Sequence, residues 1–110
     1  MLILPWPLKE LHPNARVHRM QKAKAAKQYR AACYAIAKQS KPLKGHLMIL
    51  FYPPNRQPRD LDNCLAAIKS GLDGVADAWQ VNDREFRPLT IDFADDIGGM
   101  VEIRQFDANA

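Results

Sequence analysis

The spacing of apolar residues predicts two helices. In residues 61–79 apolar side chains recur at steps of four and three, which gives a helix one narrow apolar stripe: Leu61, Leu65, Ile68, Leu72, Val75 and Trp79. Residues 20–39 contain neither Gly nor Pro and are rich in Ala, a composition that favours helix. The expected apolar face of this earlier helix contains Ala25, Tyr29, Ala32, Cys33 and Ile36.

Four shorter segments have the pattern of strands. Residues 1–6 are an apolar run interrupted by Pro5, which suits a strand near a sheet edge. Residues 45–52 are apolar at both alternating positions, as in a strand covered on two sides. Residues 89–93 and 101–104 alternate apolar and polar, and Gly98-Gly99 between them predicts a hairpin. This order predicts a single α/β (α+β) domain over 1–110, a mixed four-stranded sheet packed with two main helices.

Charge divides the chain of 110 residues into two halves. Residues 1–59 contain twelve basic and one acidic side chain, whereas residues 60–110 contain four basic and eleven acidic ones. The formal charges of +11 and −7 give the net +4 of the whole chain. A basic half favours a polyanionic partner, and an acidic half would repel that partner unless its carboxylates have another role.

Several classes of protein are disfavoured by simple counts. No apolar run approaches the roughly 18 residues of a membrane-spanning helix, so we expect no membrane partner. Cys33 and Cys64 are too few for a disulfide framework, and without a secretory signal they predict free thiols and a cytoplasmic location. The three His residues lack zinc-site spacing, and without a Gly-rich phosphate loop no organic cofactor is expected.

The segment Arg59-Asp60-Leu61-Asp62-Asn63 contains the most informative polar residues. An Asp at the start of a helix is commonly a cap, and acidic groups in the first turn complement the helix dipole. Two carboxylates two residues apart exceed what capping needs and suit a hard cation such as Mg²⁺. Asp83 is the candidate for a third carboxylate, although an Asn-Asp pair is also typical of a turn.

Lys69 is expected on the same flank of the helix 61–79 as Asp62 and Asp73. There it could neutralise a phosphate or a leaving oxygen. The alternative is a surface pair with Asp73 at i, i+4, which contributes a few tenths of a kcal/mol, roughly 0.3.

Basic side chains with few acidic neighbours favour contacts to nucleic-acid phosphates. They lie in the loop before the earlier helix and on its outer face: Arg16, Arg19, Lys24, Lys27 and Arg30. Among the aromatic side chains, Trp6 is the candidate for stacking on a base, and the others are expected in the core.

At these positions the chain resembles the RusA family of Holliday junction resolvases, particularly its short phage-encoded members. The resemblance covers nearly the whole chain through an ordered set of motifs: Leu4-Pro5-Trp6-Pro7, Asn14, Lys27-Gln28-Tyr29-Arg30, Arg59-Asp60-Leu61-Asp62-Asn63, Lys69, Asp73-Gly74 and Asn82-Asp83. Two departures are that Asn82 replaces an acidic residue, and that Ala66 stands where the better-known pattern has its lysine, one turn before Lys69.

The resemblance implies a homodimer that makes paired nicks across four-way DNA junctions with Mg²⁺, for which Mn²⁺ can substitute. It places the metal ligands and catalytic carboxylates at Asp60, Asp62 and Asp83, with Lys69 assisting, and adds Asn14 and Arg59 to the DNA-binding residues. We therefore expect a metal-dependent endodeoxyribonuclease of DNA recombination and repair. The alternatives are a non-catalytic branched-DNA-binding protein, and an RNA-directed or flap nuclease that uses the same site.

Overall fold

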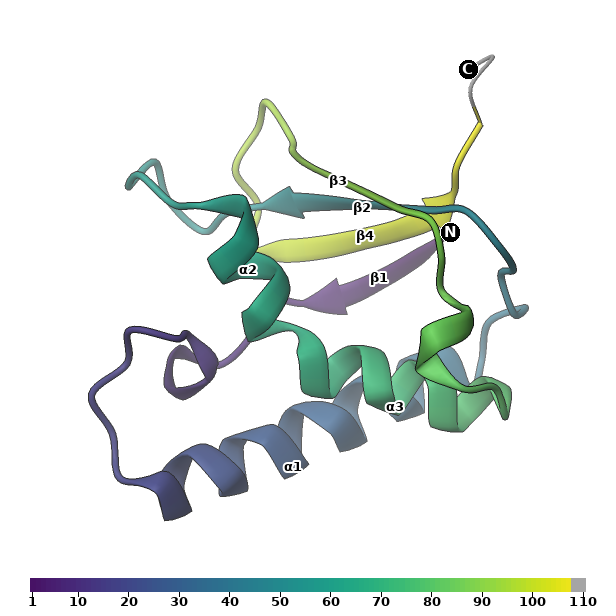
Figure 1. The fold of residues 1–110 in the computed structure, drawn as a ribbon. Coiled ribbons are helices and arrows are strands. Elements are labelled where there is room, and N and C mark those ends of the chain that lie inside the picture. Colours follow the sequence, from purple (N-terminus) through teal and green to yellow (C-terminus); the bar gives the residue numbers. More distant parts are fainter. Residues whose placement is uncertain (108–110) are drawn as a thin grey trace.

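A mixed sheet and a layer of helices make up the molecule in Figure 1, a computed structural model that describes residues 1–107. The strands are β1 (Leu2–Pro5), β2 (Leu47–Tyr52), β3 (Leu89–Phe93) and β4 (Met100–Gln105), in the spatial order β1-β4-β2-β3. The strand β4 is antiparallel to β1 and β2, and β2 is parallel to β3. The expected α+β class, the mixed four-stranded sheet and the edge position of β1 are confirmed.

The hairpin expected at Gly98-Gly99 is wrong, because β2 lies between β3 and β4. The loop 94–99 instead crosses the end of β2. Gly98 N donates to Pro53 O at 2.9 Å and Gly99 N donates to Tyr52 O at 2.7 Å. Gly99 has a φ of +72°, which favours glycine, so these residues make a turn without pairing the strands on either side of it.

The helices are α1 (Arg19–Ala37), α2 (Leu61–Ala67) and α3 (Lys69–Trp79), with short 3₁₀ turns η1 (Lys9–Leu11) and η2 (Asp83–Glu85). The single helix expected over 61–79 is wrong. The backbone leaves helical geometry at Ile68, with φ −95° and ψ 5°, and Figure 1 shows α2 and α3 running in different directions. The break puts Ile68, which is fully buried, into the core while α3 packs along α1.

The core lies between the sheet and the helices. It contains one face of the sheet, with Leu2, Leu4, Leu47, Ile49, Phe51, Val101 and Ile103 all at most 2% exposed. Tyr29 of α1 ties the layers together by donating its hydroxyl hydrogen to Pro5 O at 2.7 Å. Trp79 of α3 donates its indole N–H to Ala37 O at 3.1 Å. Cys33 and Cys64 are free and buried, as expected.

Two other expectations about burial need correction. Ala32 is exposed and Ala37 is buried instead, and Tyr34 is 39% exposed on α1 and does not reach the core. Glu102 is only 8% exposed on β4, which has a neighbouring strand on each side. No helix within residues 1–107 is both long and apolar enough to cross a membrane.

Candidate functional site

The carboxylates of Asp60 and Asp62 lie exposed at the start of α2, with Asp60 in the N-cap position and Asp62 in the first turn. The Asp60 side chain makes no capping hydrogen bond. Within residues 1–107 neither carboxylate has a hydrogen-bond or ion-pair partner. The helix dipole favours negative charge at this end of α2. Asp60 therefore occupies the cap position without acting as a side-chain cap, and both groups remain available to a ligand.

A cavity of about 190 Å³ joins Asp60 to the loop that precedes α1. Asn14 and His12 line it from that loop, and Arg59, Asp60 and Asn63 line it from the start of α2. Arg59 is held by its own loop, since its Nη1 donates to Asn55 O at 3.1 Å and to Gln57 O at 3.0 Å. The fold thus brings together three predicted site residues, Asn14, Arg59 and Asp60, from two distant parts of the sequence.

Asp83 lies in a second cluster, at the start of α3. Lys69 Nζ is 2.5 Å from Asp83 Oδ2 and 3.0 Å from Asp73 Oδ1. The hydrogen bond from Lys69 is the main cause that holds the pKa of Asp83 below its ordinary value. The hydrogen bond to Asp83, and then the one to Asp73, raises the pKa of Lys69. The predicted Lys69–Asp73 pair is present, and Asp83 joins it.

Helix α2 separates the two clusters. Lys69 is seven positions after Asp62 in the sequence, a rise of roughly 10 Å along a helix, and the break at Ile68 turns the axis between them. The expectation that Asp62 shares a flank of one helix with Lys69 and Asp73 is therefore wrong. In the part of the chain that the structure describes, no group of three or more His, Cys, Asp or Glu side chains is placed to hold a metal ion.

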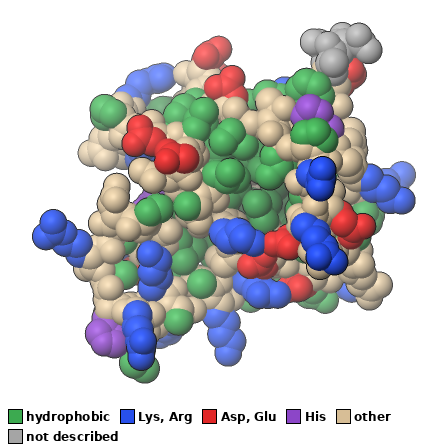
Figure 2. Space-filling view, in the orientation of Figure 1, with side chains coloured by type: hydrophobic (Ala, Val, Ile, Leu, Met, Phe, Trp, Pro, Cys, Tyr) green, Lys and Arg blue, Asp and Glu red, His purple; other side chains and the backbone are tan. Residues whose placement is uncertain are grey.

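The predicted phosphate-binding side chains lie along α1 and the loop before it. Figure 2 shows Lys and Arg side chains spread along the edge of the molecule that α1 forms. Lys24 and Lys27 are exposed, as are Arg16 and Arg19. Arg30 differs, because it makes a two-point ion pair with Asp77 of α3 at 2.7 and 3.0 Å. That pair is the main cause that lowers the pKa of Asp77 and raises that of Arg30.

Two features of the site escaped prediction from the sequence. The Arg59 guanidinium carbon lies 5.5 Å from the centroid of the Trp6 ring, and His12 lies 6.5 Å from the same ring. The contacts of Arg30 with Asp77 and of Lys69 with Asp83 also join residues that are not neighbours in the sequence, 47 and 14 positions apart. Only the i, i+4 spacing of Lys69 and Asp73 carries a local signal, because the other contacts depend on how the elements pack.

No family model matches the chain. A protein of Xylella fastidiosa (strain Temecula1 / ATCC 700964), described only as an uncharacterized protein, is 46% identical to it over 93 residues. The match covers 77% of this chain and 61% of that relative, so the chain spans about three fifths of the length of the relative.

Proposed function

We propose that the protein is a Mg²⁺-dependent, structure-selective endodeoxyribonuclease that resolves four-way DNA junctions, as its resemblance to the RusA family implies. The observation that carries the proposal is the surface at the start of α2. Two carboxylates without partners, Asp60 and Asp62, lie there beside a cavity lined by Arg59 and Asn14. Exposed carboxylates next to a cavity that contains an arginine suit a cation and a phosphate together.

The chemistry of the donors fits Mg²⁺, which prefers carboxylate and amide oxygens. Asp60 and Asp62 would hold the ion, with Asp83 as the third carboxylate, and Mn²⁺ could replace Mg²⁺. In the structure Asp83 is hydrogen-bonded to Lys69 in the other cluster, so its participation requires that it leave this partner and move toward Asp60 and Asp62. When bound, Mg²⁺ supplies positive charge that neutralises the phosphate and promotes ionisation of water.

The remaining side chains would position the DNA and its reacting phosphate. Arg59 is fixed by two backbone carbonyls and lies beside Asp60, where it can bind a phosphate oxygen. Lys69 holds a proton and a positive charge, and on release from Asp83 it can neutralise the leaving oxygen. Lys24 and Lys27 of α1, with Arg16 and Arg19 before them, would contact the DNA backbone.

The test is cleavage of synthetic four-way junctions by the full chain with Mg²⁺. We expect nicks that depend on the metal, and a fall of roughly 100-fold or more in rate for Asp62→Asn, since a lost carboxylate weakens the site that would hold the cation and so the activation of water that the cation supplies. The matched control is Asp95→Asn, which removes an exposed carboxylate from the loop after β3. Equal cleavage by the wild type and Asp62→Asn would overturn the assignment of the site.

A second candidate is a branched-DNA-binding protein without catalysis. It is favoured by the ion pair that holds Asp83 at Lys69, and by the separation of the aspartates into two clusters. This candidate predicts binding to four-way junctions without nicks at any Mg²⁺ or Mn²⁺ concentration, and no rise in melting temperature with either metal. Metal-dependent stabilisation that is lost in Asp62→Asn would exclude it.

We also propose that the protein works as a homodimer, because paired nicks across a junction need two sites. The face of the sheet opposite the helices is the surface that a second copy would cover. Register places Ile3 beside Glu102 and Glu102 beside Leu50, and in the next row Met100 lies beside Tyr52. These apolar side chains are only partly buried within one chain, and Ile3 is 37% exposed.

A further inference from the structure

Trp6 is held in a fixed orientation at the end of β1, close to the candidate site. Its ring makes a T-shaped contact with the fully buried Phe51, with centroids 6.2 Å apart and planes at 81°. Its backbone N–H donates to Gly99 O at 3.3 Å. The ring is only partly buried. Contact with Phe51 thus anchors Trp6 to the core while part of the ring stays accessible.

Arg59 and His12 surround the accessible part of this ring. The Arg59 guanidinium carbon lies 5.5 Å from the ring centroid, which is a cation–π distance, and its Nη1 bonds to two backbone carbonyls keep it there. The His12 ring lies 6.5 Å from the Trp6 ring and is tilted by 33°. Burial, and then the charge of Arg59, lowers the pKa of His12 and so favours the neutral form of this ring, which offers a flat stacking surface.

Two cavities connect these three side chains to the carboxylate of Asp60. One has a volume of about 430 Å³ and is lined by Trp6, Pro7, Lys9, His12, Pro54 and Arg59. The other is the cavity of about 190 Å³ that contains Asp60. His12 and Arg59 line both, so the two cavities adjoin. The larger volume is within the roughly 300–1,000 Å³ that is typical of sites for small organic ligands.

We propose that Trp6, His12 and Arg59 form a platform, here called the Trp6 platform, on which one unstacked DNA base binds beside Asp60. Every base has a flat π face that can stack on an aromatic or guanidinium group, so binding to such a platform does not depend on the base sequence of the DNA. Lys9, which lines the same cavity, and Arg59 supply positive charge for the phosphate of that nucleotide.

This inference rests on the proposed DNA substrate and explains how branched DNA would be selected. In an intact duplex both faces of each base are covered by its neighbours, and unstacking a base costs free energy. At a branch point or in a single strand, base faces are available at lower cost. The Trp6 platform therefore discriminates between branched and duplex DNA, whereas phosphate contacts along α1 serve both.

The first test measures stacking directly, with single-stranded thymidine octanucleotide as the probe and EDTA present so that no cleavage occurs. Trp6 is partly exposed, whereas Trp79 is only 8% exposed and is hydrogen-bonded to Ala37. Because a ligand can reach Trp6 and not Trp79, quenching of tryptophan fluorescence reports on Trp6. We expect quenching on titration of the wild type and none for Trp6→Phe. Quenching of equal depth in both proteins, or no quenching in either, would overturn the platform.

The second test measures selectivity as the ratio of dissociation constants for duplex and four-way junction, again in EDTA. Trp6→Ala and His12→Ala should bind the junction about 5- to 150-fold more weakly, the range for loss of one base–aromatic stack, with little change for duplex. Trp6→Phe should recover most of the loss. Circular dichroism checks that each variant is folded. If Trp6→Ala is not folded, His12→Ala still decides the test.

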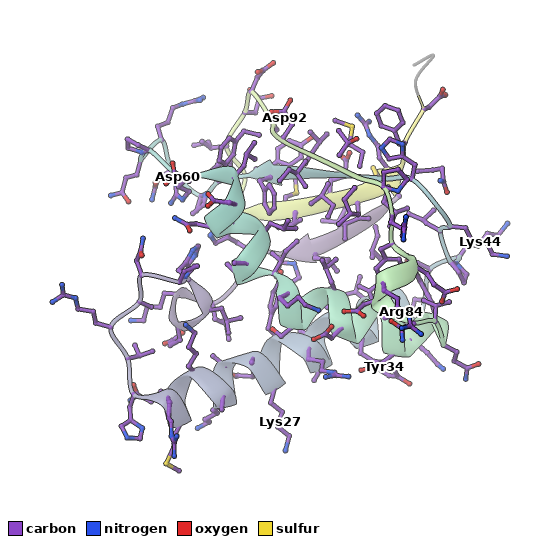
Figure 3. All side chains as sticks on the ribbon, in the orientation of Figure 1. Lys27, Tyr34, Lys44, Asp60, Arg84 and Asp92 are labelled. Atoms are coloured by element: carbon purple, nitrogen blue, oxygen red, sulfur yellow. The ribbon has the colours of Figure 1, made fainter. Side chains whose placement is uncertain are left out.

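The matched control is Tyr34→Ala. Tyr34 is also a partly exposed aromatic ring below a cation, with Lys38 Nζ 5.7 Å from its centroid, and Figure 3 shows it far from Asp60 on α1. We expect its selectivity to equal that of the wild type. A wild type that cuts junctions while Trp6→Ala keeps full selectivity would overturn the platform alone. A wild type that binds the junction but does not cut it would overturn the nuclease and leave the platform supported by its own readouts.

Discussion

Gly74 allows the backbones of α1 and α3 to approach so closely that no side chain fits between them. A Cβ atom at this position would lie 2.2 Å from Arg30 O. We expect Gly74→Ala to lower the free energy of unfolding by at least about 1 kcal/mol, because the clash outweighs the higher helix propensity of Ala. Thermal denaturation by circular dichroism should show a melting temperature that is lower by roughly 4 °C or more.

Gly98 provides the control for this substitution. A Cβ atom there would lie 3.4 Å from Tyr52 Cβ, an ordinary contact distance, and the φ of Gly98 is not positive. We expect Gly98→Ala to change the unfolding free energy by less than about 0.5 kcal/mol. Equal melting temperatures for the two variants would contradict the close approach at Gly74.

The ion pair of Lys69 with Asp83 predicts a specific pH dependence. Lys69 favours the ionised carboxylate, so the pKa of Asp83 lies below its ordinary value of 3.8. The stabilising effect is therefore fully present above that ordinary value and is lost as the pH falls through the lowered pKa. Carboxyl chemical shifts in an NMR titration should place the Asp83 midpoint below 3.8, and Lys69→Gln should move it upward.

The control for this titration is Lys41→Gln, which removes an exposed charge from the loop after α1. It should leave the midpoint of Asp83 unchanged. An Asp83 midpoint that is the same in the wild type and Lys69→Gln would show that the two groups are not paired in solution.

At the scale of elements, α1 carries the charges that we expect to bind DNA without regard to sequence. Each lysine that neutralises a phosphate adds about 0.9 to the slope of log affinity against log salt concentration. Replacing exposed Lys24 and Lys27 by Gln should therefore weaken junction and duplex binding alike and reduce the slope by about 2. Fluorescence anisotropy over a series of NaCl concentrations measures both quantities.

The matched control replaces Lys41 and Lys44 by Gln, which removes the same charge from the loop that follows α1. Figure 3 shows Lys44 on the opposite side of the molecule from Asp60. The slope of log affinity against log salt concentration for this double variant should equal that of the wild type. If both double variants reduce the slope equally, the binding depends on net charge and not on α1.

Most elements could be predicted from the sequence, because their signals are local. The absence of Gly and Pro predicted α1, and the apolar run predicted β2. The break at Ile68 could not be predicted, because the apolar stripe continues through it at helical spacing. It arises from packing on the core and on α1. The pairing of β2 with β3 also depends on packing and could not be predicted. The pair of glycines at 98–99 indicates a turn but does not specify whether the strands on either side of it pair with each other.

The candidate site was predictable in its parts and not in its arrangement. The motif around Asp60 and Asp62 identified the start of α2, and the basic composition identified α1. The cavity that joins Asn14 to Asp60, and the contact of Arg59 with Trp6, depend on folding the N-terminal loop against α2. Asp83 was predicted as a turn residue or a ligand, and it lies at a 3₁₀ turn, bonded to Lys69.

At the scale of the whole molecule, the division of charge along the sequence is only partly a division in space. The basic half forms α1 and the loops beside it, but Arg30 is paired with Asp77 of α3, and Arg59 lies beside Asp60. Part of the repulsion between DNA and the acidic half is thus offset by cations placed next to carboxylates. Within residues 1–107 the carboxylates of Asp60 and Asp62 make no hydrogen bond or ion pair, and this is where we propose that the divalent cation binds.

The face of the sheet opposite the helices is the proposed dimer interface. If a second copy covers this face, the full chain at micromolar concentration should have a mass near twice 12.5 kDa in light scattering coupled to gel filtration. Ile3 on this face and Leu89 on the edge strand β3 are both 37% exposed, so they form a matched pair. Ile3→Lys should shift the protein to the monomer, because it puts an ammonium group into the interface. Leu89→Lys should remain a dimer, and a wild type of single-chain mass would contradict the proposed assembly.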